Sequence, residues 1–199
     1  MKFKKFLSGA LLAPVALMPI AISAGCGGTK TTAVKGTMTL TEIKDSTKNG
    51  IISAKNGETQ FSYADLGQDI DSATKSWTVT IPDPAKITKG ELIPSRSGGK
   101  AQLFFSSFDD DNAFHGKFDN GQKPWDGPAL IQIEGRSRND LQFCNADSPV
   151  FVDANGREKS SGFINVESIE AKKITLAVRF MDFKGKKVSD KAYLLTITF

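Results

Sequence analysis

Apolar and polar residues alternate along most of the chain, in short runs that end at Gly, Pro, Asn or Asp. Alternation with a period of two is typical of strands that bury one face. Such runs predict strands over residues 37–41, 77–81, 102–108, 129–134, 150–153 and 163–169. No run of ten or more residues has the periodicity of an amphipathic helix. The pattern therefore predicts an all-β domain.

The C-terminal segment contains the clearest pair of strands. Apolar residues occupy the even positions from 174 to 180, which leaves Arg179 on the opposite face, and the odd positions from 193 to 199. A turn centred on Lys184 and Gly185 would place Leu176 opposite Tyr193, with both apolar faces on one side of the sheet. We expect Arg179 and the neighbouring lysines, Lys186 included, to be solvated residues at the edges of this hairpin. The alternative is a basic surface that rests against anionic lipid or lipopolysaccharide.

The number and spacing of the strands limit the architecture. About nine or ten short strands favour an antiparallel β-sandwich, with immunoglobulin-like topology as one form of it and a small barrel as the second choice. No Pro- or Ser-rich linker and no internal repeat interrupts the pattern. Residues 36–199 are therefore predicted to form a single β domain, large enough to fold without a metal or disulfide.

Residues 1–25 do not follow this pattern. Lysines at positions 2, 4 and 5 precede an apolar run over residues 6–22, which ends in small residues before Cys26. These are the parts of a secretory signal peptide. A cysteine directly after small residues resembles the lipobox of bacterial lipoproteins, in which the cysteine becomes the lipid-bearing N-terminus. The resemblance implies acylation of Cys26, palmitate included, and a short tether over residues 26–35.

Two alternatives to lipidation stay open. Ala21-Ile22-Ser23 offers small residues for ordinary signal-peptidase cleavage, which would release the exported domain. The apolar run could also remain as a membrane helix, although Pro14 and Pro19 would each remove a helical hydrogen bond. All three readings place residues 27–199 outside the cytoplasm. With a lipid on Cys26, the domain would sit at the cell envelope, on an outer membrane or on the outer face of the plasma membrane.

The basic charge of the chain belongs largely to this N-terminal segment. The formal net charge is +4, and without Lys2, Lys4 and Lys5 the remainder carries 23 basic and 22 acidic residues, a net charge of +1. A nucleic-acid-binding domain normally has a strongly basic face. We therefore expect no nucleic-acid partner. The Gly-Cys-Gly start followed by residues 34–40 resembles exported bacterial lipoproteins with immunoglobulin-like domains, which implies a binding or structural module.

Residues 108–126 concentrate acidic and aromatic side chains in one loop region. Asp109, Asp110, Asp111 and Asp119 could supply oxygen ligands to a calcium ion, the one cofactor that the sequence suggests. The spacing does not match an EF-hand loop. The other interpretation is a polar loop whose Asp side chains cap turns and remain solvated.

The same loop region predicts a surface for an envelope protein or a glycan. The aromatic and neighbouring side chains that would form it are Phe108, Phe114, His115, Phe118 and Trp125. Exposed rings that lie together mark interaction sites, whereas Phe at alternating positions is more often part of a core. We consider Trp125 the strongest candidate, because Pro124 and Gly127 place it in a turn.

No motif predicts a catalytic residue. His115 is the single histidine and lacks the companion ligands of a zinc site, and no Gly-x-Ser-x-Gly elbow is present. Cys144 would be a lone buried thiol if Cys26 is lipidated, or its disulfide partner if it is not. We therefore expect a non-enzymatic, lipid-anchored module. The alternative is a calcium-assisted carbohydrate-binding or hydrolytic module that uses residues 108–126.

Overall fold

The computed structural model describes residues 31–48, 52, 60–95, 99–137 and 139–199. The predicted signal peptide and Cys26 lie outside the described residues. The unit Thr31–Phe199 carries the fold. Among the described residues, no helix is both long and apolar enough to cross a membrane.

The described secondary structure is dominated by strands. The strands are β1 (Val34–Glu42), β2 (Ser62–Ala64), β3 (Thr78–Ile81), β4 (Gln102–Ser106), β5 (Ala113–His115), β6 (Ala129–Glu134), β7 (Gln142–Asn145), β8 (Val150–Val152), β9 (Glu158–Ser160), β10 (Phe163–Glu170), β11 (Lys173–Asp182), β12 (Lys187–Ser189) and β13 (Tyr193–Thr198). The helices are α1 (Gly67–Thr74) and the 3-10 turns η2 (Pro84–Lys86), η3 (Lys89–Glu91), η4 (Phe108–Asp110) and η5 (Pro124–Asp126).

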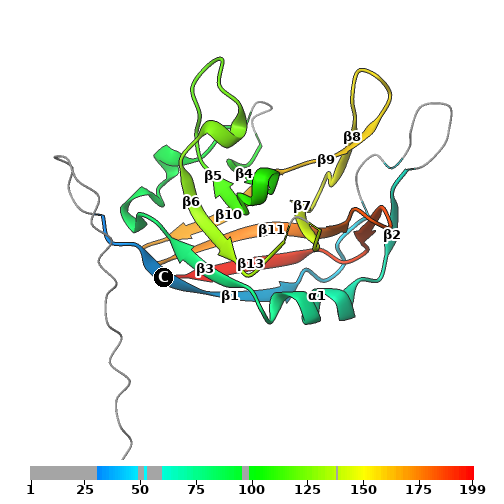
Figure 1. Ribbon diagram of the computed structural model, residues 1–199, viewed down its shortest axis with the longest axis horizontal. Helices are drawn as coiled ribbons and strands as arrows, with labels where there is room; N and C mark the ends of the chain where they lie inside the picture. Colours follow the sequence, from blue (N-terminus) through cyan, green and yellow to red (C-terminus); the bar gives the residue numbers. More distant parts are fainter. Residues whose placement is uncertain (1–30, 49–51, 53–59, 96–98, 138) are drawn as a thin grey trace, which may run out of the picture. The chain divides into compact units, whose positions relative to one another are not determined.

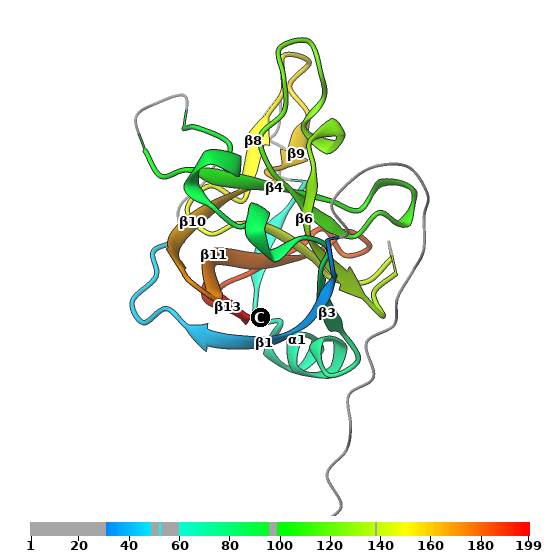
Figure 2. The ribbon, with the colours of Figure 1, turned by 90° about the vertical axis from the view of Figure 1, so that its left-hand side faces the viewer.

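Eight of these strands close into an antiparallel barrel (Figures 1 and 2). Their order is β10-β4-β5-β6-β3-β1-β13-β11, and β11 pairs again with β10 to complete the circle. The all-β prediction is confirmed, and the small barrel is the architecture found. The sandwich, our first choice, is replaced because β10 is hydrogen-bonded to both β4 and β11. A sandwich would leave edge strands at that junction, whereas closure removes them.

The barrel encloses the main apolar core. Ile174, Leu176, Val178 and Phe180 of β11 contribute their side chains to this core, as their even spacing predicts. Trp77, which precedes β3, packs against Phe180 with ring centroids 6.3 Å apart. The core is therefore continuous from the strands of the barrel to the start of β3.

The second half of β11 extends beyond the barrel. There it pairs with β7 and β12, and β2 adds to β12 as a parallel strand. A second apolar cluster, the satellite cluster, lies on this extension and consists of Phe61, Cys144, Val150, Met181 and Val188. The extension therefore gives β11 apolar neighbours on both of its faces.

Arg179 is buried in this extension, which corrects the expectation that it is solvated. Its side chain is 0% exposed. The guanidinium donates to the carbonyl oxygens of Ala146 (2.7 Å), Ser189 (3.0 Å) and Thr47 (2.6 Å). The alternation assigned Arg179 to the correct face, but that face is covered by segments from elsewhere in the chain.

The C-terminal hairpin has the predicted turn and a register shifted by two residues. Asp182 lies opposite Lys187, so the turn is centred on Lys184 and Gly185 as expected. Further along, Leu176 lies opposite Leu195 instead of Tyr193. The shift occurs after Ser189, whose hydroxyl accepts the N–H of Phe180 (3.0 Å) and donates to the carbonyl of Lys191 (2.7 Å). A shift of two residues keeps the same side chains on the buried face.

Candidate functional site

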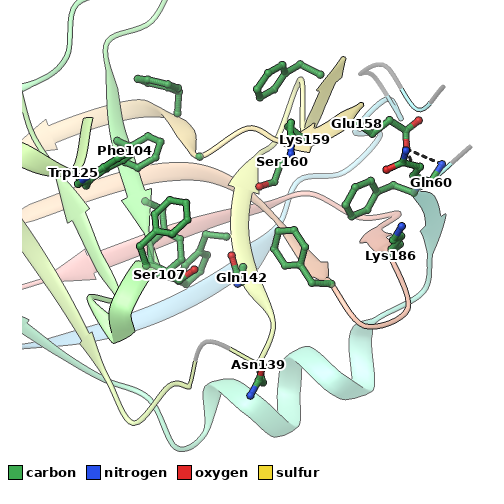
Figure 3. Close-up of a pocket in the computed structure, with 18 of the residues that line it drawn as sticks. Gln60, Phe104, Ser107, Trp125, Asn139, Gln142, Glu158, Lys159, Ser160 and Lys186 are labelled. Atoms are coloured by element: carbon green, nitrogen blue, oxygen red, sulfur yellow. Dashed lines mark hydrogen bonds between the residues drawn. The ribbon is translucent and has the colours of Figure 1, made fainter. Parts of the chain in front are cut away.

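A groove lined by aromatic rings is formed by residues of the barrel strands β4 and β10, of β7 and of the β8–β9 pair (Figure 3). Its cavity volume is about 760 Å³. The rings that line it are Phe61, Phe104, Phe105, Phe108, Trp125, Phe143, Phe151, Phe163 and Phe183. Neutral and charged side chains also line the groove: Gln60, Ser107, Asp109, Asn139, Gln142, Glu158, Lys159, Ser160 and Lys186. We call this feature the aromatic groove.

The exposed apolar side chains of the described residues converge on this groove. The large hydrophobic residues that are exposed are Phe108 (62%), Trp125 (42%), Phe151 (46%) and Phe183 (40%), and all four line it. Phe143, by contrast, is buried and belongs to the barrel core. The groove therefore combines a floor fixed by the core with a rim of exposed rings, which is typical of an interaction site.

The first end of the groove is formed by Phe108, Trp125 and Phe104. The ring of Trp125 lies 5.3 Å from that of Phe108 and 6.2 Å from that of Phe104, centroid to centroid. Among the residues that follow Phe108, three have left-handed backbone: φ is 50° at Asp109, 62° at Asp110 and 49° at Asn112. Non-glycine residues adopt this conformation at a cost, and such positions often cluster at functional sites.

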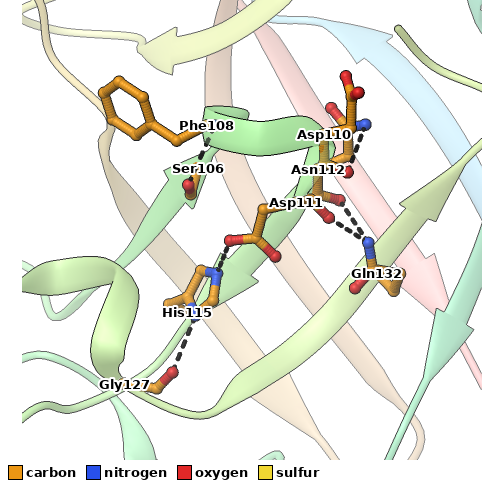
Figure 4. Close-up of polar contacts among 8 residues, drawn as sticks. All are labelled: Ser106, Phe108, Asp110, Asp111, Asn112, His115, Gly127 and Gln132. Atoms are coloured by element: carbon orange, nitrogen blue, oxygen red, sulfur yellow. Dashed lines mark hydrogen bonds and ion pairs between the residues drawn. The ribbon is translucent and has the colours of Figure 1, made fainter. Parts of the chain in front are cut away.

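His115 connects the two segments that form this first end (Figure 4). Its Nδ1 lies 2.8 Å from the carbonyl oxygen of Gly127, and its Nε2 lies 2.6 Å from Oδ2 of Asp111. A carbonyl oxygen only accepts, so Nδ1 carries the hydrogen of that contact. Both ring nitrogens are thereby used. His115 positions Phe108 and Trp125 and has no nitrogen left for a metal or a nucleophile.

Arg136 joins the same end to the core. Its Nε donates to the carbonyl oxygen of Leu141 (2.8 Å), and Nη1 donates to Oδ1 of Asn112. The guanidinium also lies over the rings of Phe105 (5.3 Å) and Trp77 (6.0 Å). Burial lowers the pKa of Arg136 to about 10. The loop that carries Phe108 is therefore held by buried polar contacts on two sides.

The second end of the groove is formed by Phe61, Phe151 and Phe183 with Lys159 and Lys186. Phe61 and Phe183 contact edge to face, with centroids 6.0 Å apart. Phe151 lies opposite Lys159 in the β8–β9 pair. Figure 3 shows Lys186 on the side of the groove opposite Trp125. The two ends therefore come from segments that are distant in the sequence.

Glu158 connects the β8–β9 hairpin to the second end. Its Oε2 accepts the backbone N–H groups of Gln60 (2.8 Å) and Phe61 (2.7 Å). The side chain is 4% exposed, and Oε1 has no hydrogen-bond partner within the described part of the chain. One carboxylate therefore fixes the hairpin next to Phe61.

The structure divides the predicted partner-binding residues. Phe108 and Trp125 line the groove and are exposed, whereas Phe118 is half-buried and does not line it. Phe114 is 0% exposed because β5 places it opposite Ile131, inside the barrel, and His115 is 5% exposed. These two residues cannot form part of a contact surface. The sequence did not indicate Phe151, Phe183 or Lys159 as site residues, and Lys186 was expected among the basic residues of the C-terminal hairpin. The signal for Phe151 and Phe183 was a phenylalanine beside turn residues.

The predicted metal ligands do not form a cluster in the structure. Among the described residues, no group of three or more His, Cys, Asp or Glu side chains could hold a metal ion together. Asp109, Asp110, Asp111 and Asp119 are therefore not gathered into one site, and calcium binding stays a prediction.

Cys144 is a free thiol, fully buried, and burial raises its pKa. A buried thiol with a raised pKa is chemically inert.

The fold and the groove together define a closed antiparallel β-barrel that carries a groove lined by aromatic rings. The chain belongs to the family described as Mycoplasma P30 protein, which matches residues 37–198. This is a family of mycoplasma surface proteins. No curated protein and no solved structure matches the chain.

Proposed function

We propose that this protein is a lipid-anchored binding protein of the mycoplasma surface and that its partner binds in the aromatic groove. One observation carries the proposal: the four exposed large apolar side chains of the described residues all line the same groove. Scattered exposed rings need no explanation, but rings gathered around one cavity mark a binding site.

The size and construction of the groove support this function. Ligand-binding pockets usually measure about 300 to 1,000 Å³ and have apolar walls with a few polar groups, and the groove fits both descriptions. Phe105 and Phe143 of its lining are packed in the barrel core, so the floor is formed before a ligand arrives. Binding to a preformed site loses less conformational entropy.

The start of β1 is compatible with a short tether. β1 begins at Val34, so the strand takes up the last residues of the predicted tether, and residues 27–33 would separate a lipidated Cys26 from the barrel. Thr198 lies opposite both Thr37 and Lys173, which places the start of β11 at the end where the chain enters the barrel. Ten residues of strand span about 30 Å. Phe183, just after β11, therefore lies at the end of β11 opposite to Thr37.

The anchor is tested by replacing the cysteine. In membrane and soluble fractions of the native host, the wild-type protein should sediment with membranes and Cys26→Ser should not. Cys144→Ser is the matched control, because that buried thiol carries no lipid in this proposal. Intact mass should show a diacylglycerol and an acyl chain on Cys26. An unmodified N-terminus at Ala24, or membrane retention of the Cys26→Ser variant, would overturn the anchor.

The groove is tested with phenylnaphthylamine, an uncharged aromatic probe whose fluorescence rises in apolar sites. We expect the exported domain to bind the probe, and a Phe108→Ser/Phe151→Ser/Phe183→Ser variant to bind it at least about tenfold more weakly, a loss of about 1.4 kcal/mol. Phe118→Ser, outside the groove, is the control. Thermal melting must show that both variants fold. Equal affinity of the triple variant and wild type would refute the groove as the site.

A further inference from the structure

We infer that the ligand of the groove is a small anionic amphiphile, whose apolar part lies on the rings and whose acidic group lies at Lys159 and Lys186. The inference rests on the proposed function and adds the chemistry of the ligand. It follows from three features: the charge of the second end, the backbone of Lys186 and the pairing of the strands in the floor.

The second end of the groove carries two lysines, with the carboxylate of Glu158 in the same lining and Asp153 close enough to interact electrostatically with Lys159. Lys159 and Lys186 line the groove with exposed side chains, and neither forms an ion pair within the described part of the chain. The acid that lines this end, Glu158, is buried, and its carboxylate accepts two backbone N–H groups. The two ammonium groups are therefore exposed to a ligand, whereas the carboxylate beside them is buried.

Nearby acids are also engaged in their own turns. Oδ1 of Asp153 accepts the N–H groups of Asn155 (2.9 Å) and Arg157 (2.9 Å), and Oδ1 of Asp182 accepts that of Lys184 (2.9 Å). The first end differs, because the charged residue of its lining is Asp109. An acidic group on the ligand would thus be drawn to one end and repelled from the other, which sets a direction of binding.

The backbone of Lys186 is held in an unfavourable conformation at the mouth of the groove. Its φ is 49°, although lysine is not among the residues that commonly adopt left-handed backbone. The carbonyl of Lys186 accepts the N–H of Ser62 (3.0 Å), which fixes this conformation. Strain that surrounding structure maintains is characteristic of functional positions. Of the five non-glycine residues with positive φ in the described part of the chain, Asp109 and Lys186 line this groove.

The floor of the groove favours a small ligand over an extended peptide. A peptide that binds as an added strand needs a free strand edge. β4 pairs with both β10 and β5, and β10 pairs with both β4 and β11, so neither strand offers one. Along β4 and β10, recognition must then come from side chains: rings for the apolar part and ammonium groups for the acid.

The test compares two probes that share an aromatic body and differ in charge. Anilinonaphthalene sulfonate carries one negative group, and phenylnaphthylamine carries none. In Lys159→Gln/Lys186→Gln, we expect the dissociation constant of the sulfonate to rise at least tenfold and that of the neutral probe to change less than twofold. Lys75→Gln/Lys172→Gln, with the same change in charge on exposed lysines outside the groove lining, should leave both constants unchanged.

Competition then identifies the source of the ligand. Oleate should displace the bound sulfonate in wild type, which supports a free amphiphile. Displacement only by anionic phospholipid vesicles, or only by acidic peptides, would overturn the small-ligand inference. Equal weakening of both probes in the lysine variant, or of neither, would overturn the role of the lysines while leaving the groove as a binding site. Failure of the neutral probe to bind wild type would instead refute the proposed function.

Discussion

The first end of the aromatic groove stands on the core of the barrel, whereas the second end stands on the satellite cluster outside it. Behind Phe108, the ring of Phe105 packs with Phe114 and Phe143 in the main core. Behind Phe183, the ring of Phe61 belongs to the satellite cluster, which is far smaller. A small cluster buries less apolar surface and stabilises less. We therefore expect the second end to open more readily than the first.

One buried arginine supports each end of the groove, and both arginines act as hydrogen-bond donors to oxygen atoms of neighbouring segments. Arg136 donates to a carbonyl oxygen and to the amide oxygen of Asn112, and Arg179 donates to three carbonyl oxygens. Neither forms an ion pair with an acid among the described residues. A guanidinium can join several backbone segments at once because it has five donors in a fixed plane. Buried arginines thus replace apolar packing where loops meet.

The largest effect is expected from removing these donors. Arg179→Met keeps an apolar stem but leaves three carbonyl oxygens without their donor, so we expect a loss of about 3 to 5 kcal/mol in the free energy of unfolding. Arg136→Met should cost less, about 2 to 4 kcal/mol, because two strong acceptors lose their donor. Urea unfolding of the exported domain measures both.

Arg179→Met and Arg136→Met together test whether the two ends of the groove unfold independently. Arg179→Met should disturb Phe61 and Phe183 and spare Phe108, and Arg136→Met should do the reverse, as hydrogen exchange of each segment would show. Lys172→Met, an exposed site, is the control. If both variants loosen both ends equally, the two ends form one cooperative unit and the distinction drawn above is wrong.

An intermediate effect is expected from the single side chains that position each end. Glu158→Ala removes the acceptor of two buried N–H groups and should cost about 1.5 to 3 kcal/mol, with faster exchange at Phe61. His115→Ala removes two hydrogen bonds and should cost about 2 kcal/mol, with a shift in the emission of Trp125. Glu158→Gln keeps one acceptor oxygen and should lose less than Glu158→Ala. Equal losses in the Gln and Ala variants would show that the hydrogen bonds are not what holds the hairpin.

Alternation along the chain predicted the strands well but not how they close. The six runs identified from the sequence all correspond to strands, because each buries one face of its own residues. Closure between β10 and β11, and the burial of Arg179, depend on which segments pack on the far face of β11. That information lies in other parts of the chain, so a local pattern cannot contain it.

For the same reason, the sequence predicted the residues of the first end of the groove but not those of the second. Phe108 and Trp125 share one segment rich in turn residues, which indicated exposed rings. Phe151 and Phe183 meet them only because the hairpin and the β11–β12 turn fold over the same groove. Phe114 shows the opposite error, since a phenylalanine near acids in the sequence is fully buried once β5 pairs with β6. Neighbouring positions in the sequence showed which side chains are available in a segment. The fold determined which of those side chains are exposed.

The smallest effect is an acid transition confined to the second end. Hydrogen bonds from the N–H of Arg157, and to a lesser degree from that of Asn155, lower the pKa of Asp153 below its ordinary value. A carboxyl whose pKa is lower in the folded state stabilises the turn above the unfolded pKa, and this contribution is lost as pH falls through the folded one. Below about pH 4 the amide signals of Asn155 and Arg157 should therefore shift in NMR spectra. Asp153→Asn should abolish this transition, because the side chain no longer titrates. Persistence of the same transition in Asp153→Asn would mean that another acid controls the hairpin, and that the second end is not independently sensitive to acid.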